Sequence, residues 1–292
     1  LRDGVWRWQP GKRYPQQPCT RGGPLRISTY NVQTICRPGR WQEVLEEVGM
    51  QGQGAHILLL QGTRSHRPSH VTASEPGVEV FVMVVRSTLW KIWNFPATTE
   101  DSHAGLAVAI RFSTLEGLRV SAIEIAQGRL AQLTLKSQWC HLVLIVAYLP
   151  AAGIWEMACK TLWSTLEDLW GQVPRWATVL LGGDFNAHVG PTACRDGLRA
   201  VGGGSPRRVC PKGRILMELL DRFGLVAVNT FRGGATFCGT RGQSRIDFLI
   251  VRKSDWLLGR CGEVALLRTA ADWTQLSPGV DHVPVTCCLT MG

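Results

Sequence analysis

Short apolar runs that end in polar side chains constrain the fold of this chain more than any other feature. Residues 177–181 form one such run, which leads through Gly182 and Gly183 into Asp184 and Asn186. A run of this length bounded by glycines is typical of a buried β-strand. Because residues i and i+2 of a strand point to the same face, Asp184 and Asn186 are expected to leave the strand side by side. The alternative is a turn in which these side chains bond their own backbone.

Four other runs repeat this arrangement of an apolar segment with polar residues at or near its end. They span residues 25–32, 57–64, 245–249 and 280–285. A carboxylate such as that of Asp184 can take a proton from water, and a neighbouring carboxamide can hold a phosphate oxygen without competing for that proton. Several such strand ends in one chain therefore indicate a polar site built from residues far apart in the sequence.

The rest of the chain alternates strand-like and helix-like segments, with no obvious linker after residue 25. Helices are expected at residues 41–49, 154–170 and 213–223. Many antiparallel-type strands with helices outside predict two packed sheets, an α/β sandwich, in one domain over residues 25–292. Strands are expected at residues 25–30, 55–60, 78–85, 105–111, 120–125, 130–135, 141–148, 177–181, 225–229, 245–251 and 283–289.

Composition limits the class of protein and the kind of partner. Hydrophobic residues make up 45% of the 292 residues, so a real core is expected and wholesale disorder is excluded. The formal net charge of +10 favours a polyanion, either nucleic acid or an anionic membrane surface, although a basic protein without such a partner has the same charge. No apolar run is long enough for a transmembrane helix. The ten cysteines lack metal-type spacing and are expected to be mostly reduced, as in an intracellular protein.

Two basic segments stand out along the chain. Residues 1–24 read as a flexible basic arm, either a solvated tail or a nucleic-acid tether. Residues 194–214 form a basic, glycine-containing loop that follows the strand at 177–181. Such a loop could grip a phosphate backbone or be an ordinary solvated surface loop.

Seven short motifs follow one another along the chain. They are Asn31, Gln61-x-Thr63-Arg64, Tyr148-x-Pro150, Gly183-Asp184-Phe185-Asn186-Ala187, Thr236-Phe237, Ile246-Asp247 and Asp281-His282. This order resembles the endonuclease/exonuclease/phosphatase family, and within it the apurinic-type endonuclease domain of non-LTR retrotransposons and craniofacial-development-like proteins. The resemblance runs from about residue 25 to the last residue. It implies a two-sheet β-sandwich flanked by helices, the four-layer DNase I-like fold.

The resemblance also implies roles in cleaving a phosphodiester. Asp184 suits the general base or water-positioning group, and Asn186 suits a phosphate contact. His282 is expected to donate to the scissile phosphate, and Asp247 to hold its imidazole in one tautomer. Tyr148 is implied to assist the phosphate or the leaving group. Each residue also has a simpler explanation when it is read singly, such as a turn cap or a strand-end tyrosine.

Further assignments complete the expected site. Thr236 resembles a position near the scissile phosphate, and Arg207 and Arg208 of the basic loop are expected to bind substrate. Asn31 and Asp281 are implied to hold a Mg²⁺ or Mn²⁺ ion.

Gly62 is the main departure from the family. The family has Gln-Glu-Thr, in which the glutamate is the principal metal ligand, whereas this chain has Gln61-Gly62-Thr63. The ion is therefore expected to bind weakly, with Asp281 as its clearest carboxylate. A glutamate at position 62 is expected to fit if the strand end opens into the cleft, and to restore the site. Glu100 or Asp101 is the alternative anchor for the metal.

Three functions remain open from the sequence. The first is a Mg²⁺-dependent, DNA-nicking endonuclease domain of a retroelement polyprotein, acting on duplex DNA in the nucleus, with a reverse transcriptase domain expected in a longer chain. The second is a catalytically decayed copy that binds nucleic acid or protein, which Gly62 favours. The third is a phosphatase or phosphodiesterase for a small phosphoester, which the basic charge and the motif pattern disfavour. The sequence leaves the oligomeric state open.

Overall fold

The computed structural model describes most of the chain, including all of the expected strands. The residues it describes are 5–6, 23–50, 54–66, 78–151, 156–191, 198–203, 209–232, 234–240, 242–266 and 281–290. Most of the expected basic arm, and Arg207 and Arg208 of the basic loop, lie outside these residues.

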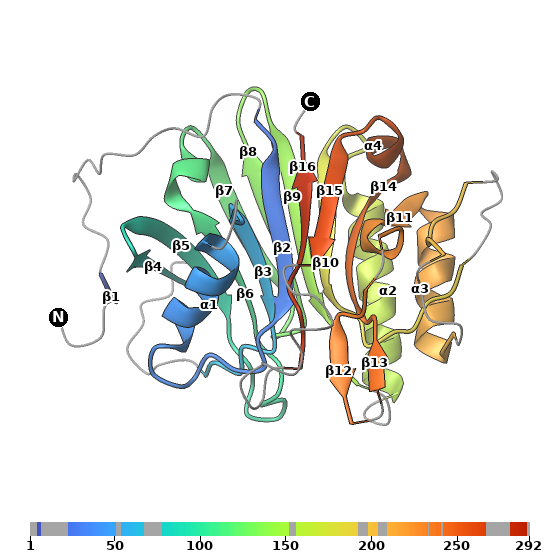
Figure 1. Ribbon diagram of the computed structural model, residues 1–292, viewed down its shortest axis with the longest axis horizontal. Helices are drawn as coiled ribbons and strands as arrows, with labels where there is room; N and C mark the ends of the chain where they lie inside the picture. Colours follow the sequence, from blue (N-terminus) through green and yellow to red (C-terminus); the bar gives the residue numbers. More distant parts are fainter. Residues whose placement is uncertain are drawn as a thin grey trace.

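Two β-sheets pack face to face. The first has eight strands in the order β1 (Val5–Trp6), β4 (Glu79–Val85), β5 (Thr88–Phe95), β6 (Leu106–Arg111), β3 (Ile57–Gln61), β2 (Leu25–Asn31), β16 (Val285–Leu289) and β15 (Cys261–Leu266). The second has six, in the order β11 (Leu225–Ala227), β14 (Asp247–Arg252), β10 (Thr178–Asp184), β9 (His141–Tyr148), β8 (Leu130–Lys136) and β7 (Arg119–Ala126). A hairpin of β12 (Phe237–Gly239) and β13 (Gly242–Ser244) projects from one end (Figure 1).

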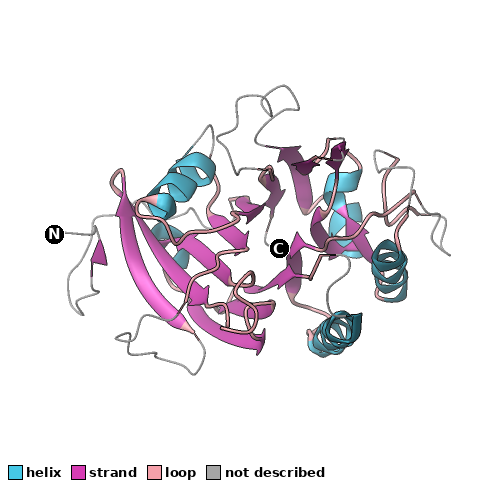
Figure 2. Ribbon diagram, turned by 90° about the horizontal axis from the view of Figure 1, so that it is seen from below, coloured by secondary structure: helices cyan, strands magenta, loops and turns pink. Residues whose placement is uncertain are grey.

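Helices cover the outer faces of both sheets, which gives the predicted four-layer α/β sandwich (Figures 1 and 2). Helix α1 (Arg40–Met50) packs on the eight-stranded sheet through Val44, Leu45 and Val48. Helices α2 (Glu156–Gln172) and α3 (Pro211–Arg222) pack on the six-stranded sheet through apolar faces that include Trp163 and Leu216. Short helical turns complete the fold: η1 (Phe112–Leu115), η2 (Val228–Thr230) and α4 (Lys253–Leu257). Within the described residues, no helix has both the length and the apolar character needed to cross a bilayer.

The sheets approach each other closely at β10. A Cβ atom on Gly182 would lie 2.6 Å from Leu59 Cδ1 of β3 and 3.4 Å from Thr29 Cβ of β2, so a larger residue would push the sheets apart. This contact brings the ends of β2 and β3 beside the ends of β9 and β10. Because β2 pairs with β3 in parallel, and β9 with β10 in parallel, the chain leaves each pair at a single edge.

The sequence misses β1, β5, β12, β13, β15 and α4, and it places the end of β11 too late. Strand β5 follows a tight turn at Arg86 and Ser87, with φ of +43° and +66°. Hairpin turns with two positive φ angles usually carry Asn-Gly or Asp-Gly, so this turn gives no recognisable signal. The expected strand at residues 225–229 ends at Ala227, and the chain continues as the 3-10 turn η2.

Candidate active site

Polar residues from both sheets meet where these strands end. Asn31 is the last residue of β2, Tyr148 the last of β9 and Asp184 the last of β10. Asp247 is the first residue of β14 and is paired directly with Asp184 in the antiparallel ladder. His282 is brought beside them by an isolated bridge to Phe237 of β12. The site expected from the motifs therefore forms at one edge of the sandwich.

Asp247 holds His282 as the resemblance implies. His282 Nδ1 lies 3.0 Å from Asp247 Oδ2 and 3.2 Å from Oδ1, and both side chains are buried. The other ring nitrogen, Nε2, faces Asp184 Oδ2 at 3.9 Å and Asp281 Oδ1 at 3.7 Å. These distances are longer than hydrogen bonds, so Nε2 can donate to an atom that enters between the carboxylates.

The carboxylates keep the imidazole charged. Burial alone would lower the pKa of His282, but the charges of Asp247, Asp184 and Asp281 and the Asp247 hydrogen bond raise it to about 9. At neutral pH both ring nitrogens therefore carry protons, and His282 is a donor.

Asp184 has the opposite character. Complete burial, followed by the nearby charge of Asp247, raises the pKa of Asp184 to about 7, against the lowering effects of His282, Asn31 and the Asn186 backbone. Its Oδ2 accepts from Asn31 Nδ2 at 2.9 Å. A carboxylate with a pKa near neutrality is suited to taking a proton from water, which fits the base role.

Asn186 does not continue the strand alternation that the sequence predicted. The strand ends at Asp184, and Asn186 has φ of +46°. Asp184 Oδ1 accepts the Asn186 backbone N–H at 2.9 Å, which is the turn that the sequence offered as the alternative. Asn186 Nδ2 donates to the Leu149 carbonyl at 2.8 Å, so the amide braces the end of β9 against β10. Its role as a phosphate contact stays a prediction.

The expected metal position carries a residue that the motifs missed. Gln33 has φ of +64°; its backbone N–H donates to Asn31 Oδ1 at 3.0 Å, and its side-chain amide donates to Asp281 Oδ1. Asn31 and Asp281 do approach the site, but each already accepts a hydrogen bond from Gln33. Gln33 lies two residues after a motif asparagine, which is its only signal in the sequence.

The sequence analysis expected a side chain to fit at position 62, but the structure disfavours one there. Gly62 has φ of +64°, and a Cβ there would lie 2.5 Å from Asn31 Oδ1. That oxygen belongs to a buried side chain fixed by bonds to Gln33 and Asp184. The expectation that a glutamate would fit is therefore wrong for this backbone.

Asp101, one of the two alternative metal anchors, is already bonded to another residue. Asp101 accepts two bonds from Arg129, Nε to Oδ2 and Nη2 to Oδ1, each of 2.7 Å. The Arg129 guanidinium in turn lies 4.6 Å from the Tyr148 ring centroid. Glu100 is exposed. Asp101 thus supports the tyrosine through Arg129 and is not free to anchor an ion.

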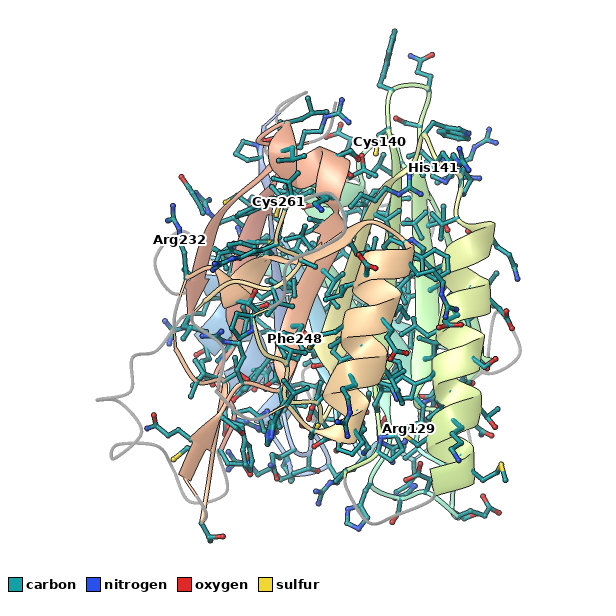
Figure 3. All side chains as sticks on the ribbon, turned by 90° about the vertical axis from the view of Figure 1, so that its right-hand side faces the viewer. Arg129, Cys140, His141, Arg232, Phe248 and Cys261 are labelled. Carbon is teal, nitrogen blue, oxygen red and sulfur yellow. The ribbon has the colours of Figure 1, made fainter. Side chains whose placement is uncertain are left out.

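Tyr148 is half-buried at the end of β9. Burial, then the charge of Asp184, raises the pKa of Tyr148, while Arg129, a hydrogen bond with Asn31 and the charge of Arg64 oppose the rise. The phenol therefore stays protonated and can donate. Figure 3 shows His141, the first residue of β9, and Arg129 at opposite ends of the molecule, which places Tyr148 at the Arg129 end.

Thr236 is fully buried and supports Asp247. Its hydroxyl oxygen accepts the backbone N–H groups of Ile246 and Asp247, each at 3.1 Å. These bonds fix the start of β14, from which the Asp247 carboxylate extends. A contact between Thr236 and substrate stays a prediction.

Asp184, Asp247 and His282 place one ligand atom each within 4.8 Å of one another, close enough to hold a metal ion. In the arrangement described, however, Nδ1 of His282 is bonded to Asp247, and the protonated ring repels a cation. The acidic groups therefore suit an ion only if some of these bonds rearrange.

Comparison with known proteins agrees with this geometry. Residues 142–285 match the family described as "Endonuclease-reverse transcriptase". No curated protein matches the chain. Among solved structures, the endonuclease domain of TRAS1, a telomere-specific non-LTR retrotransposon, is similar with a TM-score of 0.57 and 16% identity over 92% of this chain and 99% of that one.

Two other solved structures have the same fold. The AP endonuclease LMAP from Leishmania major gives a TM-score of 0.62 with 13% identity over 92% of this chain and 89% of its own. The cytolethal distending toxin of Haemophilus ducreyi gives 0.53 with 15% identity over 91% and 98%. The chain thus has the DNase I-like α/β sandwich, and it resembles the endonuclease/exonuclease/phosphatase family and its retrotransposon endonuclease domains, as the order of its motifs predicted.

Proposed function

We propose that this chain is a DNA-nicking endonuclease domain of a retroelement-type polyprotein, and that its site binds Mg²⁺ or Mn²⁺ only weakly. One observation carries the proposal: Asp184 and His282 face the same space with opposite proton chemistry, and Asp247 fixes the imidazole. A protonated imidazole beside a carboxylate whose pKa lies near neutrality provides the donor and the acceptor that general acid–base catalysis needs.

The residues divide the work of phosphodiester hydrolysis. Asp184 accepts the proton of the attacking water, and Nε2 of His282 donates to a non-bridging oxygen of the phosphate, where charge develops in the transition state. The protonated Tyr148 hydroxyl supplies a second donor. Arg64 places positive charge near Tyr148, and its Nε is buried without a hydrogen-bond partner within the described part of the chain. Arg64 therefore complements an anionic substrate at this edge.

A divalent ion, when bound, would neutralise charge on the phosphate. Asp281 and Asn31 would hold it, and only after Gln33 releases them. With no carboxylate at Gly62, the affinity is expected to be low. The same observation favours a second function, a decayed copy of the domain that binds nucleic acid without cutting it.

The wider context of the proposal follows from the substrate. We propose a nuclear location because duplex DNA is the proposed substrate, and the match to an endonuclease-reverse transcriptase family supports the proposal of a fused reverse transcriptase domain in a longer chain.

Plasmid nicking across Mg²⁺ and Mn²⁺ titrations tests this function. Asp184→Asn and His282→Ala should each remove most of the nicking while DNA binding persists, because both groups act mainly in the transition state. Asp247→Ala should resemble His282→Ala. His141→Ala, at the other end of β9, is the matched control and should nick like the native chain. Near-normal nicking by His282→Ala would overturn the site assignment. If the native chain fails to nick at every Mg²⁺ and Mn²⁺ concentration, the result favours the decayed copy.

A further inference from the structure

Gln33 lies at the exit of β2, at a position that no motif covers. Its backbone N–H and its side-chain amide reach two different residues, Asn31 and Asp281, which lie 250 positions apart in the sequence. These are the two residues that the resemblance assigns to the metal. A single residue thus occupies lone pairs on both expected ligands.

The side-chain bond is made to the inward oxygen of Asp281. Gln33 Nε2 donates to Asp281 Oδ1, and the same oxygen lies 3.7 Å from His282 Nε2. An amide N–H and a divalent cation both seek carboxylate lone pairs, so the amide occupies the position from which an ion would bind.

The amide end of Asn31 is fixed by the same network. Asn31 Nδ2 donates to Asp184 Oδ2 at 2.9 Å, and Asn31 Oδ1 accepts from the Gln33 backbone at 3.0 Å. Asn31 is almost completely buried, with 4% of its surface exposed, so it cannot turn away without breaking both bonds. Gln33 therefore closes the metal position from both sides.

We propose that the Gln33 carboxamide is a built-in substitute for the divalent cation, and that it sets how tightly this chain binds Mg²⁺ or Mn²⁺. The inference rests on the proposed function for its biological meaning, but not for its test. An ion binds only when the amide leaves Asp281, and the free energy of that bond is subtracted from the free energy of ion binding.

Position 33, and not position 62, is then the place where a carboxylate rebuilds the site. Gln33→Glu keeps the length of a side chain that already reaches Asp281, and it exchanges the N–H donor for a metal-binding oxygen. The residue already has φ of +64° with a side chain, so the substitution adds no new backbone strain. At Gly62 the same change places a Cβ 2.5 Å from Asn31 Oδ1.

Mn²⁺ binding, measured by electron paramagnetic resonance on the purified chain, tests the proposal directly. Gln33→Ala should bind Mn²⁺ more tightly than the native chain, and Gln33→Glu more tightly still, by about tenfold or more, which is the usual scale of effects from groups bonded to metal ligands. Adding Asp281→Asn to Gln33→Glu should remove the gain. Gln132→Ala, which removes an amide on β8 that donates to Thr134, is the matched control and should bind like the native chain.

Thermal unfolding provides a second measurement on the same variants. Without metal, Gln33→Glu should unfold at a lower temperature than the native chain because the new carboxylate repels Asp281. Mn²⁺ should raise its unfolding temperature more than it raises that of the native chain, since a ligand that binds only the folded state stabilises it. Equal Mn²⁺ affinity and equal stabilisation in the native chain and both Gln33 variants would overturn the proposal.

Nicking assays on the same preparations separate the two ideas. Tighter Mn²⁺ binding by Gln33→Glu without nicking by any variant would keep the role of Gln33 and reject the endonuclease function. If the native chain nicks DNA but Gln33→Ala and Gln33→Glu bind Mn²⁺ with the same affinity as the native chain, the endonuclease function stands and the role of Gln33 as a cation substitute is rejected.

Discussion

At Gly62 the backbone conformation, and not only the missing side chain, disfavours a glutamate. A residue other than glycine at φ of +64° costs roughly 1–2 kcal/mol, and the Cβ contact with Asn31 adds to that cost. We therefore predict that Gly62→Glu lowers the free energy of unfolding by at least about this amount and fails to restore tight Mg²⁺ binding. Gly62→Ala, which has the Cβ but no carboxylate, should be destabilised to a similar extent in urea titrations. A Gly62→Glu protein as stable as the native chain would contradict this account.

His282 and Asp184 should make the stability of the domain depend on pH in one direction. The pKa of His282 is raised from 6.5 to about 9, so its contribution is complete below pH 6.5 and is lost as pH rises through about 9. The pKa of Asp184 is raised from 3.8 to about 7, so stability also falls as pH rises through that range. In both cases the folded state holds more protons than the unfolded state.

We therefore predict that the unfolding temperature falls as pH rises from 6.5 to about 9. The fall should be shallower for His282→Gln, whose side chain does not titrate, and calorimetry at matched ionic strength would show the difference. A native unfolding temperature that rises across this interval would contradict the protonated imidazole.

The sequence predicted which residues form this site better than it predicted the hydrogen bonds and the backbone conformation around them. Asp184, Asp247 and His282 meet as the motifs implied, because Asp184 ends a buried strand, Asp247 begins one and His282 lies just before one, and the burial of these strands fixes their positions. Gln33 and the left-handed backbone at Gly62 could not be predicted, because neither φ nor a bond between residues 33 and 281 follows from local sequence.

Strand β14 begins at the edge that carries the candidate active site, and its start is held by side chains from outside the strand. Thr236 Oγ1 accepts from the N–H groups of Ile246 and Asp247, and Asn229 Nδ2 donates to the Asp247 carbonyl at 2.9 Å. Thr236→Val keeps the shape of the side chain but leaves buried N–H groups without an acceptor. We predict a loss of about 1–3 kcal/mol in unfolding free energy. Because Asp247 is released, kcat should fall by a larger factor than that by which KM changes.

Thr236→Ser keeps the acceptor and should recover both stability and kcat, as measured by urea unfolding and single-turnover nicking. A direct role of Thr236 at the substrate would instead leave the stability of Thr236→Val unchanged while KM rises.

Strands with plain alternation or apolar runs were predicted, and those that depend on irregular backbone were not. Strand β15 contains a register shift between Gly262 and Ala265, with Glu263 at φ of +46°, so its pairing does not follow a period of two. Strand β5 depends on the Arg86–Ser87 turn in the same way. Tertiary pairing with neighbouring strands, and not local preference, forms these strands.

For the whole molecule, the net charge of +10 predicts how DNA binding responds to salt. Neutralising several phosphates releases counterions, so affinity should fall steeply between low and physiological salt and depend little on sequence. Fluorescence anisotropy with a labelled duplex would measure this, and a flat salt response would count against a nucleic-acid partner.

Deleting residues 1–24 should reduce both the affinity and the salt slope while the domain stays folded, because the described part of this segment adds β1 at the outer edge of the eight-stranded sheet. Circular dichroism of the deleted chain serves as the control. Loss of folding on this deletion would mean that the pairing of Val5–Trp6 with β4 is essential.

The position of β16 has a consequence for the order of events during synthesis. This strand is the last that the structure describes, yet it lies inside the eight-stranded sheet, between β2 and β15, and all five of its residues are buried. A ribosome must therefore finish almost the whole domain before the sheet can close. His282 lies three residues before β16 and reaches Asp247 only when that segment is in place. The candidate site accordingly cannot assemble until the segment that forms β16 has been translated.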